Sequence, residues 1–165
     1  MTALLSIRPE TALVWGTVAT IAMTVLLEGA RRLHWSRMSI PLIMGAVFTG
    51  THAAKSANGF VAYLDGGILF AFVYASFFES VGGATWWLGC AAGLLHGLWL
   101  LVVFLPILAD VHPRMATERT GPNRLRRLEP PGIAGINYGL RTPLVTMAGQ
   151  AVYGTILGFG YGLSS

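Results

Sequence analysis

The stretch that decides the fold is ATWWLGCAAGLLHGLWLLVVFLPILA at residues 84–109. Its only acid or base that titrates near neutral pH is His96. An uninterrupted run of 18 or more apolar residues is typical of a helix that crosses the hydrocarbon core of a bilayer. This stretch therefore predicts a membrane-spanning helix, and the rest of the chain is interpreted around it.

Small residues recur along one side of this predicted helix. Gly89, Gly93 and Gly97 fall four positions apart, which places them in one stripe on a helix. Such a stripe lets two helix backbones approach closely in lipid. Stripes of the same kind occur in three other apolar segments and predict close packing of all the helices. The glycines assigned to this packing are Gly16, Gly67, Gly89, Gly93, Gly97, Gly154 and Gly158.

The composition also favours a membrane protein. Of the 165 residues, 54% are hydrophobic and only 11% are charged, and the mean hydropathy is +0.62. Soluble domains average about 25% charged residues. The formal net charge is +4. Because the positive charges stand in short segments beside apolar runs, we interpret them as topology determinants and expect no nucleic-acid partner.

The predicted fold class is an all-α integral membrane bundle of four transmembrane helices, forming a single domain over residues 1–165. A Gly82-Gly83 turn would join the second and third helices as a hairpin, and Pro106 is expected to kink the third. Thr142 is expected to cap the fourth helix just before Pro143. The predicted spans cover about 11–30, 60–81, 84–109 and 143–163, with basic cytoplasmic loops at 31–59 and 110–142.

Residues 38–59 are ambiguous in sequence. MSIPLIMGAVFTG is apolar but short, whereas THAAKSANG is too polar to lie in hydrocarbon. We therefore expect a short interfacial or re-entrant helix followed by a loop, and the sequence leaves open which of the two it is.

The basic residues predict the orientation. In a four-span arrangement, Arg8 lies on one side of the membrane and the other ten of the 11 Lys and Arg residues lie on the opposite side. Lys and Arg are enriched in cytoplasmic loops. We therefore expect a multi-pass protein of the bacterial inner membrane with both termini on the non-cytoplasmic side. No positively charged leader precedes the first apolar run, so the first helix is expected to stay in the mature protein.

Polar side chains inside the predicted spans are candidate functional groups. His96 is the deepest, roughly 18 Å into its helix at 1.5 Å per residue. It is either a haem or chlorin ligand, a proton relay or a quinone contact, or else a neutral histidine bonded to Gln150 or Tyr153 at similar depth. A second histidine at that depth is not expected, so no cofactor is predicted, with haem or chlorin at His96 as the alternative.

A second group is predicted at the cytoplasmic ends of the helices. Glu28 can pair with Arg31 and Arg32, three and four residues further along. Asp65 stands near the start of the second span, and Arg141 precedes the last. We predict a cluster of Glu28, Asp65 and Arg141 that either pins helix ends or forms a proton or ion entrance. Glu79, at the opposite end, is expected to be solvated.

The longest loop is rich in arginine and is expected to contact anionic lipid head groups or an acidic partner, or only to set the topology. No metal site and no catalytic constellation are recognisable in the sequence, so the protein is not expected to be an enzyme. The loop arginines concerned are Arg114, Arg119, Arg124, Arg126 and Arg127.

Several motifs resemble those of the YagU-like family, a group of small bacterial four-helix inner-membrane proteins with a domain of unknown function. The motifs are GTVATIAMT at 16–24, GILFAFVYASFF at 67–78, GCAAGLLHG at 89–97 and AVYGTILG at 151–158. The family pattern carries two histidines where this chain has the Ala62-Tyr63 pair and Gln150. The resemblance implies a four-span bundle and no known activity.

These observations predict a non-catalytic accessory or scaffolding subunit of a larger bacterial membrane complex, serving respiratory or photosynthetic electron transfer beside other membrane subunits. One alternative is a small oligomeric transporter or proton or ion channel that uses Asp65, His96 and Gln150 as a polar path. The other is a cofactor-binding membrane protein with His96 as ligand.

Overall fold

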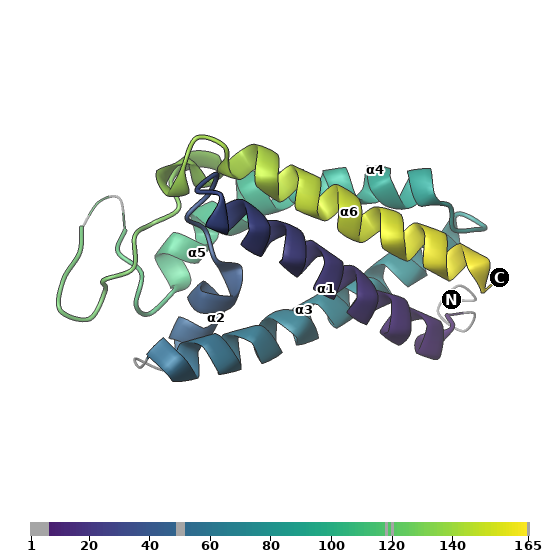
Figure 1. Ribbon diagram of the computed structural model, residues 1–165, viewed down its shortest axis with the longest axis horizontal. Coiled ribbons are helices and arrows are strands. Elements are labelled where there is room, and N and C mark those ends of the chain that lie inside the picture. The colour runs from purple at the N-terminus through teal and green to yellow at the C-terminus, as the bar shows by residue number, and fades with distance from the viewer. Residues whose placement is uncertain (1–6, 49–51, 118, 120, 165) are drawn as a thin grey trace. The chain divides into compact units, whose positions relative to one another are not determined.

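The computed structural model describes residues 7–48, 52–117, 119 and 121–164. These residues form helices and no strand, only the isolated bridges Met115–Leu128 and Thr117–Gly121. The predicted all-α class is therefore confirmed. The elements are α1 (Pro9–Arg32), α2 (Ile40–Phe48), α3 (His52–Ser80), α4 (Trp86–Trp99), η1 (Leu100–Phe104), α5 (Leu105–Val111), η2 (Ile133–Tyr138) and α6 (Thr142–Leu163) (Figure 1).

Three helical segments are long and apolar enough to cross a membrane: Pro9–Arg32, Ala57–Ser80 and Trp86–Val111. They correspond to the first three predicted spans. The fourth predicted span is also a helix, α6, but it is not among the three. Gln150, Tyr153 and several glycines interrupt the aliphatic residues along α6.

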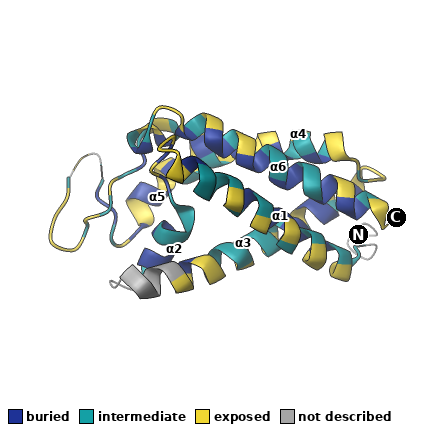
Figure 2. Cartoon of the chain, viewed as in Figure 1, coloured by how far each residue is buried: buried dark blue, intermediate teal, exposed yellow. Residues whose placement is uncertain are grey.

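The helix α6 is more buried than the three long apolar segments. Half of its residues are buried, whereas the buried share of the apolar windows in the other three segments is 28%, 17% and 28%. Figure 2 shows the buried colour recurring along α6. Much of the α6 surface therefore contacts other parts of the protein rather than the surrounding solvent or lipid.

The segment after α2 differs from the prediction. A short helix was expected there and is found as α2, but residues 52–59 were expected to be a loop and instead form the first two turns of α3. A Cβ atom at Gly59 would lie 1.8 Å from the carbonyl oxygen of Pro41, so α2 and the start of α3 are in direct backbone contact. Tertiary packing thus makes this polar stretch helical. Residues 49–51 of the segment lie outside the described residues.

Pro106 does not end the third predicted span. Leu100–Phe104 form a π-helical stretch between α4 and α5, and the backbone N–H of Leu105 donates to the carbonyl oxygen of Leu100. Proline provides no N–H and its ring crowds the carbonyl four residues before it. The wider π turn keeps the chain helical at the point where a regular α-turn would be interrupted.

The chain divides into two compact units, which we describe separately. The first unit comprises Met1–Leu26, Leu64–Gly97 and Met147–Ser165, and the second comprises Leu27–Tyr63 and Leu98–Thr146.

Glycine contacts hold α4 against α6 in the first unit. A Cβ at Gly89 would lie 2.0 Å from the carbonyl oxygen of Gly154, and one at Gly93 would lie 2.1 Å from that of Gln150. A Cβ at Gly158 would lie 2.2 Å from the carbonyl oxygen of Thr85. The predicted glycine stripes therefore face each other, and the two backbones touch without intervening side chains.

The same packing joins α1 to α3 in the first unit. A Cβ at Gly16 would lie 2.5 Å from the Cβ of Ala71, and one at Gly67 would lie 2.1 Å from the hydroxyl oxygen of Thr20. The Thr20 hydroxyl donates to the carbonyl oxygen of Gly16 at 2.7 Å, which satisfies it within its own helix. All the glycines named from the sequence thus lie at helix contacts.

The first unit buries mainly small and aromatic side chains and exposes most of its aliphatic ones, the inverse of a soluble protein. Its largest fully buried side chains are Tyr153, Tyr161, Phe78, Leu157 and Thr20, whereas most aliphatic residues point outward. In water an exposed apolar surface of this kind would drive association, but in hydrocarbon it costs nothing. The exposed aliphatic residues include Leu13, Val14, Val18, Ile21 and Val25 of α1, Leu69 and Val73 of α3, and Leu94, Leu95 and Leu98 along α4.

In the second unit, the segment after α1 is tied to the segment before α6. The backbone N–H of Arg37 donates to the carbonyl oxygen of Tyr138 at 2.7 Å, and the hydroxyls of Ser36 and Thr142 bond at 2.8 Å. The Thr142 hydroxyl is fully buried and bonds a residue 106 positions away in sequence. Because a hydroxyl can donate one bond and accept another, this contact does not test the predicted cap of α6.

Candidate functional site

His96 lies in an aromatic setting inside the first unit. Its Nδ1 atom is 3.3 Å from the hydroxyl of Tyr74 on α3, and its ring centroid is 4.1 Å from that of Phe70. The sequence predicted contacts with Gln150 or Tyr153 and did not identify Tyr74. The Tyr74 ring also meets the ring of Tyr153 edge-on at 5.5 Å, which is a favoured aromatic geometry.

The other two predicted intramembrane polar residues differ in how they are satisfied. The hydroxyl of Tyr153 donates to the carbonyl oxygen of Gly67 and so joins α6 to α3. Gln150 is 6% exposed, and its Oε1 atom is buried without a hydrogen-bond partner among the described residues. An unsatisfied buried amide oxygen is costly, so the packing of the described residues does not explain Gln150.

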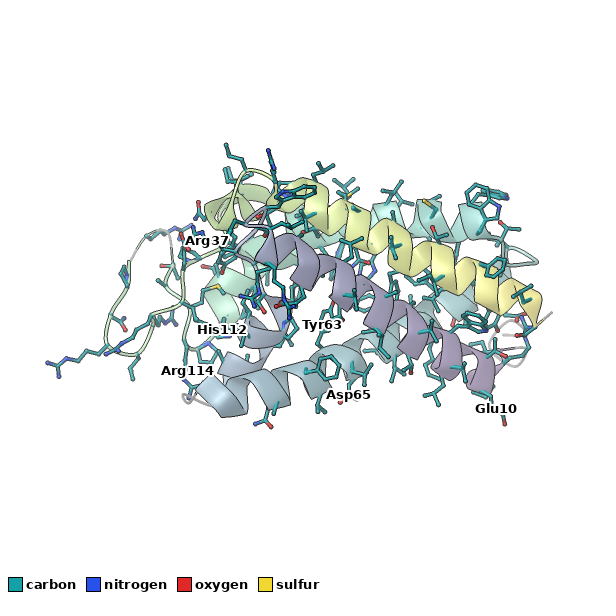
Figure 3. All side chains as sticks on the ribbon, viewed as in Figure 1. Glu10, Arg37, Tyr63, Asp65, His112 and Arg114 are labelled. Carbon is teal, nitrogen blue, oxygen red and sulfur yellow. The ribbon has the colours of Figure 1, made fainter. Side chains whose placement is uncertain are left out.

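Two members of the predicted cytoplasmic cluster, Glu28 and Arg141, belong to the second unit and Asp65 belongs to the first, so the cluster stays a prediction. Glu28 binds the arginines of its own helix, with Arg31 Nη2 at 2.7 Å and Arg32 Nε at 3.4 Å, as the sequence predicted for those pairs. The remaining two members have other environments: Asp65 is exposed on α3 (Figure 3), and the Arg141 guanidinium lies 5.5 Å from the centroid of the Trp35 ring.

A polar network at one end of the first unit was not predicted. The backbone N–H of Arg8 donates to the hydroxyl of Tyr161 at 3.1 Å, and that hydroxyl donates to Glu79 Oε1 at 2.8 Å. Arg8 Nη2 donates to the carbonyl oxygen of Tyr161 and lies 3.8 Å from Glu79 Oε1. The guanidinium also lies over the Tyr161 ring, 4.1 Å from its centroid. Glu79 is therefore bonded, not simply solvated as expected.

The network borders a cavity of about 210 Å³. One nitrogen of Arg8, Nη1, is buried without a hydrogen-bond partner among the described residues. The sequence did contain a signal for this site. The topology prediction placed the acidic Glu79 at the same end of the bundle as Arg8, the one basic residue predicted on that side. The cavity is lined by Arg8, Phe78, Glu79, Gly82, Gly83, Ala84 and Tyr161.

Replacing Tyr161 by phenylalanine is expected to lower the free energy of unfolding by about 1–2 kcal/mol, because the bonds to Arg8 and Glu79 are both lost while the ring stays. A double-mutant cycle with Glu79→Gln, followed by thermal unfolding in detergent, measures the coupling between the two side chains. We expect the two losses to be less than additive. Fully additive losses would contradict the network.

The second unit contains a different polar site around α2. His112 is fully buried; its Nε2 atom lies 3.0 Å from the carbonyl oxygen of Ile43, and its Nδ1 atom accepts from the backbone N–H of Arg114 at 3.1 Å. Since Nδ1 accepts, Nε2 carries the proton and donates to Ile43. Arg114 Nη1 donates to the carbonyl oxygens of Ala46 and Val47. Figure 3 labels both side chains beside α2.

Arg114 therefore serves a structural role that the loop prediction did not include. The last carbonyls of a helix have no partner within the helix and carry the negative end of its dipole. The Arg114 guanidinium satisfies two of them at the end of α2, and His112 bonds the carbonyl of Ile43 further inside the helix. Both nitrogens of His112 are thereby occupied by the protein.

The other arginines named in the loop prediction remain at the surface. Arg119, Arg124 and Arg127 are exposed and Arg126 is partly buried. Asn123 Oδ1 accepts from the backbone N–H groups of Leu125 and Arg126, which turns the chain so that Leu125, 80% exposed, stands among these arginines. Their predicted contact with lipid or an acidic partner remains a prediction.

A buried tyrosine completes the second unit's polar contacts. The Tyr138 hydroxyl donates to the carbonyl oxygen of Glu129 at 2.6 Å, and burial raises the pKa of Tyr138 to about 12. The phenol is therefore protonated at neutral pH and remains a hydrogen-bond donor. The Glu129 carboxylate meanwhile pairs with Arg37 at 3.1 Å.

Chemically, the described side chains offer hydrogen-bonding and ion-pairing groups rather than a reactive constellation. Within the described part of the chain, no three His, Cys, Asp or Glu residues come together as potential metal ligands. The residues of the predicted polar path differ in burial: Asp65 is exposed, His96 is partly buried and Gln150 is buried.

Comparison with known proteins gave no match to a family model, a curated protein or a solved structure.

Proposed function

We propose that this chain is a four-span membrane protein that acts as a non-catalytic accessory or scaffolding subunit of a larger bacterial membrane complex. Its fourth span is α6, half of whose residues are buried. Both termini lie on the non-cytoplasmic side of the inner membrane, because ten of the 11 basic residues then face the cytoplasm. The resemblance to the YagU-like family supports the same architecture.

The observation that carries this proposal is the inside-out distribution of side chains. Glycine, alanine, threonine and tyrosine fill most helix contacts of the first unit, and most leucine, valine and isoleucine side chains face outward, with the buried Leu157 as an exception. Helices in lipid associate through such close small-residue contacts. The outward aliphatic faces then have two suitable neighbours, the hydrocarbon of the bilayer and the helices of partner subunits.

The choice of an accessory subunit rests on the chemistry of the described residues. Their buried polar groups mainly bond backbone carbonyls or each other, as Tyr153, His112 and Tyr161 do. Groups committed to holding helix ends and contacts suit a structural role. A respiratory or photosynthetic electron-transfer complex is the assembly that we propose for it.

The test is the native mass of the tagged protein, extracted from its own membrane in a mild detergent, with every co-purifying chain identified. We expect an assembly much larger than the 17.6 kDa chain, with fixed partners. A mass near that of the single chain or a small multiple of it would reject the subunit proposal. Recovery of the chain in the soluble fraction would reject the membrane assignment itself.

A second candidate, a small transporter or ion channel, is favoured by one observation. The buried Oε1 atom of Gln150 has no hydrogen-bond partner among the described residues, and polar groups that face a solvated path inside a membrane are often functional. If the native mass proves small, ion flux through liposomes containing the wild type or the Gln150→Leu variant is the next measurement. Flux that is lost in the variant would support this candidate.

A further inference from the structure

The second unit contains a cavity of about 480 Å³ that none of the arguments above uses. It lies where α5 ends, and residues of the following loop and of η2 complete it. Its volume falls within the roughly 300–1,000 Å³ typical of ligand pockets. The lining residues are Pro106, Ala109, Asp110, Thr117, Arg119, Pro131, Gly132, Ile133, Ile136 and Asn137.

Two opposite charges border this cavity and are not paired. Asp110 and Arg119 both line it, and both are exposed. Neither side chain forms an ion pair or a hydrogen bond with the residues that the structure describes. Elsewhere in this unit, acidic groups are paired, as Glu28 is with Arg31 and Glu129 is with Arg37. The cavity therefore presents one free acceptor and one free cation to a ligand.

The rest of the lining is mostly apolar and adjoins the end of a candidate span. Pro106, Ile133 and Ile136 contribute to the cavity, and Ile133 is 81% exposed. Their neighbours on α5, Ile107 and Val111, are 53% and 69% exposed and belong to the segment Trp86–Val111 that is able to cross a membrane. An apolar surface thus leads from this helix end into a cavity with charged groups.

We propose that this cavity binds the head group of a zwitterionic phospholipid that carries a primary amine, of the phosphatidylethanolamine type. The ammonium group donates hydrogen bonds to the Asp110 carboxylate, and the phosphate accepts from the Arg119 guanidinium. An acyl chain lies along Ile133 and the exposed face of α5. This inference rests on the membrane assignment proposed above and adds a specific lipid to it.

The charges of the cavity discriminate among head groups. An anionic lipid without an amine meets Arg119 but leaves the Asp110 carboxylate unpaired beside a phosphate. A quaternary ammonium, as in phosphatidylcholine, carries the positive charge but has no N–H to donate. A primary ammonium combines the charge with three donors, as a lysine does.

The experiment uses the full-length protein in nanodiscs and counts the lipids retained in native mass spectrometry. Ethanolamine, choline and glycerol phospholipids with identical acyl chains compete at equal concentration. The variants are Asp110→Asn and Arg119→Gln, and the control is Arg127→Gln, an exposed loop arginine that does not line the cavity. Circular dichroism verifies that each variant is folded.

For the wild type we expect roughly tenfold preference for the ethanolamine lipid over the choline lipid, the effect of one charge-assisted hydrogen bond. Asp110→Asn should abolish this preference, Arg119→Gln should weaken retention of both lipids, and Arg127→Gln should change neither. Equal retention of the two lipids by the wild type, or a preference that survives Asp110→Asn, would overturn the proposal. Soluble phosphoethanolamine that displaces the lipid completely would overturn the role of the acyl chain.

The same experiment separates this inference from the membrane assignment. A protein that does not enter nanodiscs contradicts the assignment to the membrane. A protein that enters nanodiscs and retains lipids without head-group preference contradicts only the lipid site. Preference for the glycerol lipid that is lost in Arg127→Gln would indicate general attraction to the basic loop and would likewise overturn the site.

Discussion

Replacing Gly93 by alanine is expected to destabilise the protein strongly, although alanine is the better helix former. The added Cβ would lie 2.1 Å from the carbonyl oxygen of Gln150 and 3.3 Å from the Cα of Ala151. Both contacts are with the backbone of α6, so no side-chain rotation relieves them and the two helices must separate. Overpacking of this kind typically costs about 1–3 kcal/mol. Thermal unfolding in a mild detergent measures the loss.

Gly66→Ala is the matched control. Gly66 also lies inside a long helix, but a Cβ there would meet nothing within 4 Å. Without a steric penalty, alanine should stabilise α3 by up to about 1 kcal/mol through its helix propensity. The two substitutions should therefore change the melting temperature in opposite directions. Equal melting temperatures for Gly93→Ala and Gly66→Ala would contradict the close packing of α4 on α6.

The second large effect is expected for Arg114→Gln in the second unit. Its guanidinium satisfies the carbonyl oxygens of Ala46 and Val47, and a shorter neutral amide cannot reach both. Each buried carbonyl left unsatisfied costs about 1–3 kcal/mol. Because the loss falls on the end of a nine-residue helix, α2 should open locally. Hydrogen–deuterium exchange should become much faster in residues 40–47 than in α6.

Arg127→Gln separates this effect from the loss of a positive charge. Arg127 is exposed, and its Nε atom donates only to the carbonyl oxygen of the nearby Arg124. Its substitution should leave exchange in α2 unchanged. Faster exchange in α2 in both variants would point to a general effect of loop charge and would argue against the specific role of Arg114.

The long apolar helices and their contact faces could be predicted because both depend on local periodicity. A run of apolar residues is a property of consecutive positions, and Gly89, Gly93 and Gly97 share a face in any α-helix. The pairing of Glu28 with Arg31 and Arg32 is equally local, three and four residues apart. The turn at Gly82 followed from its position between two apolar runs, and its φ of +84° suits glycine.

The polar contacts could not be predicted in the same way. Arg8 reaches Tyr161 across 153 positions of sequence, and Ser36 reaches Thr142 across 106. His112 and Arg114 bond the carbonyls of α2, which have no side-chain signature in sequence. For the same reason, the cluster of Glu28, Asp65 and Arg141, inferred from helix ends alone, stays a prediction.

The sequence by itself determined the helical class, the positions of the long apolar helices and the glycine faces, since these arise from spacing along one chain. Tertiary structure alone decided which partner each polar group found across long sequence separations, as for Arg8 with Tyr161 and Ser36 with Thr142. A hydrogen bond requires donor and acceptor within about 3 Å. Residues distant in sequence reach such separations only after the helices have packed.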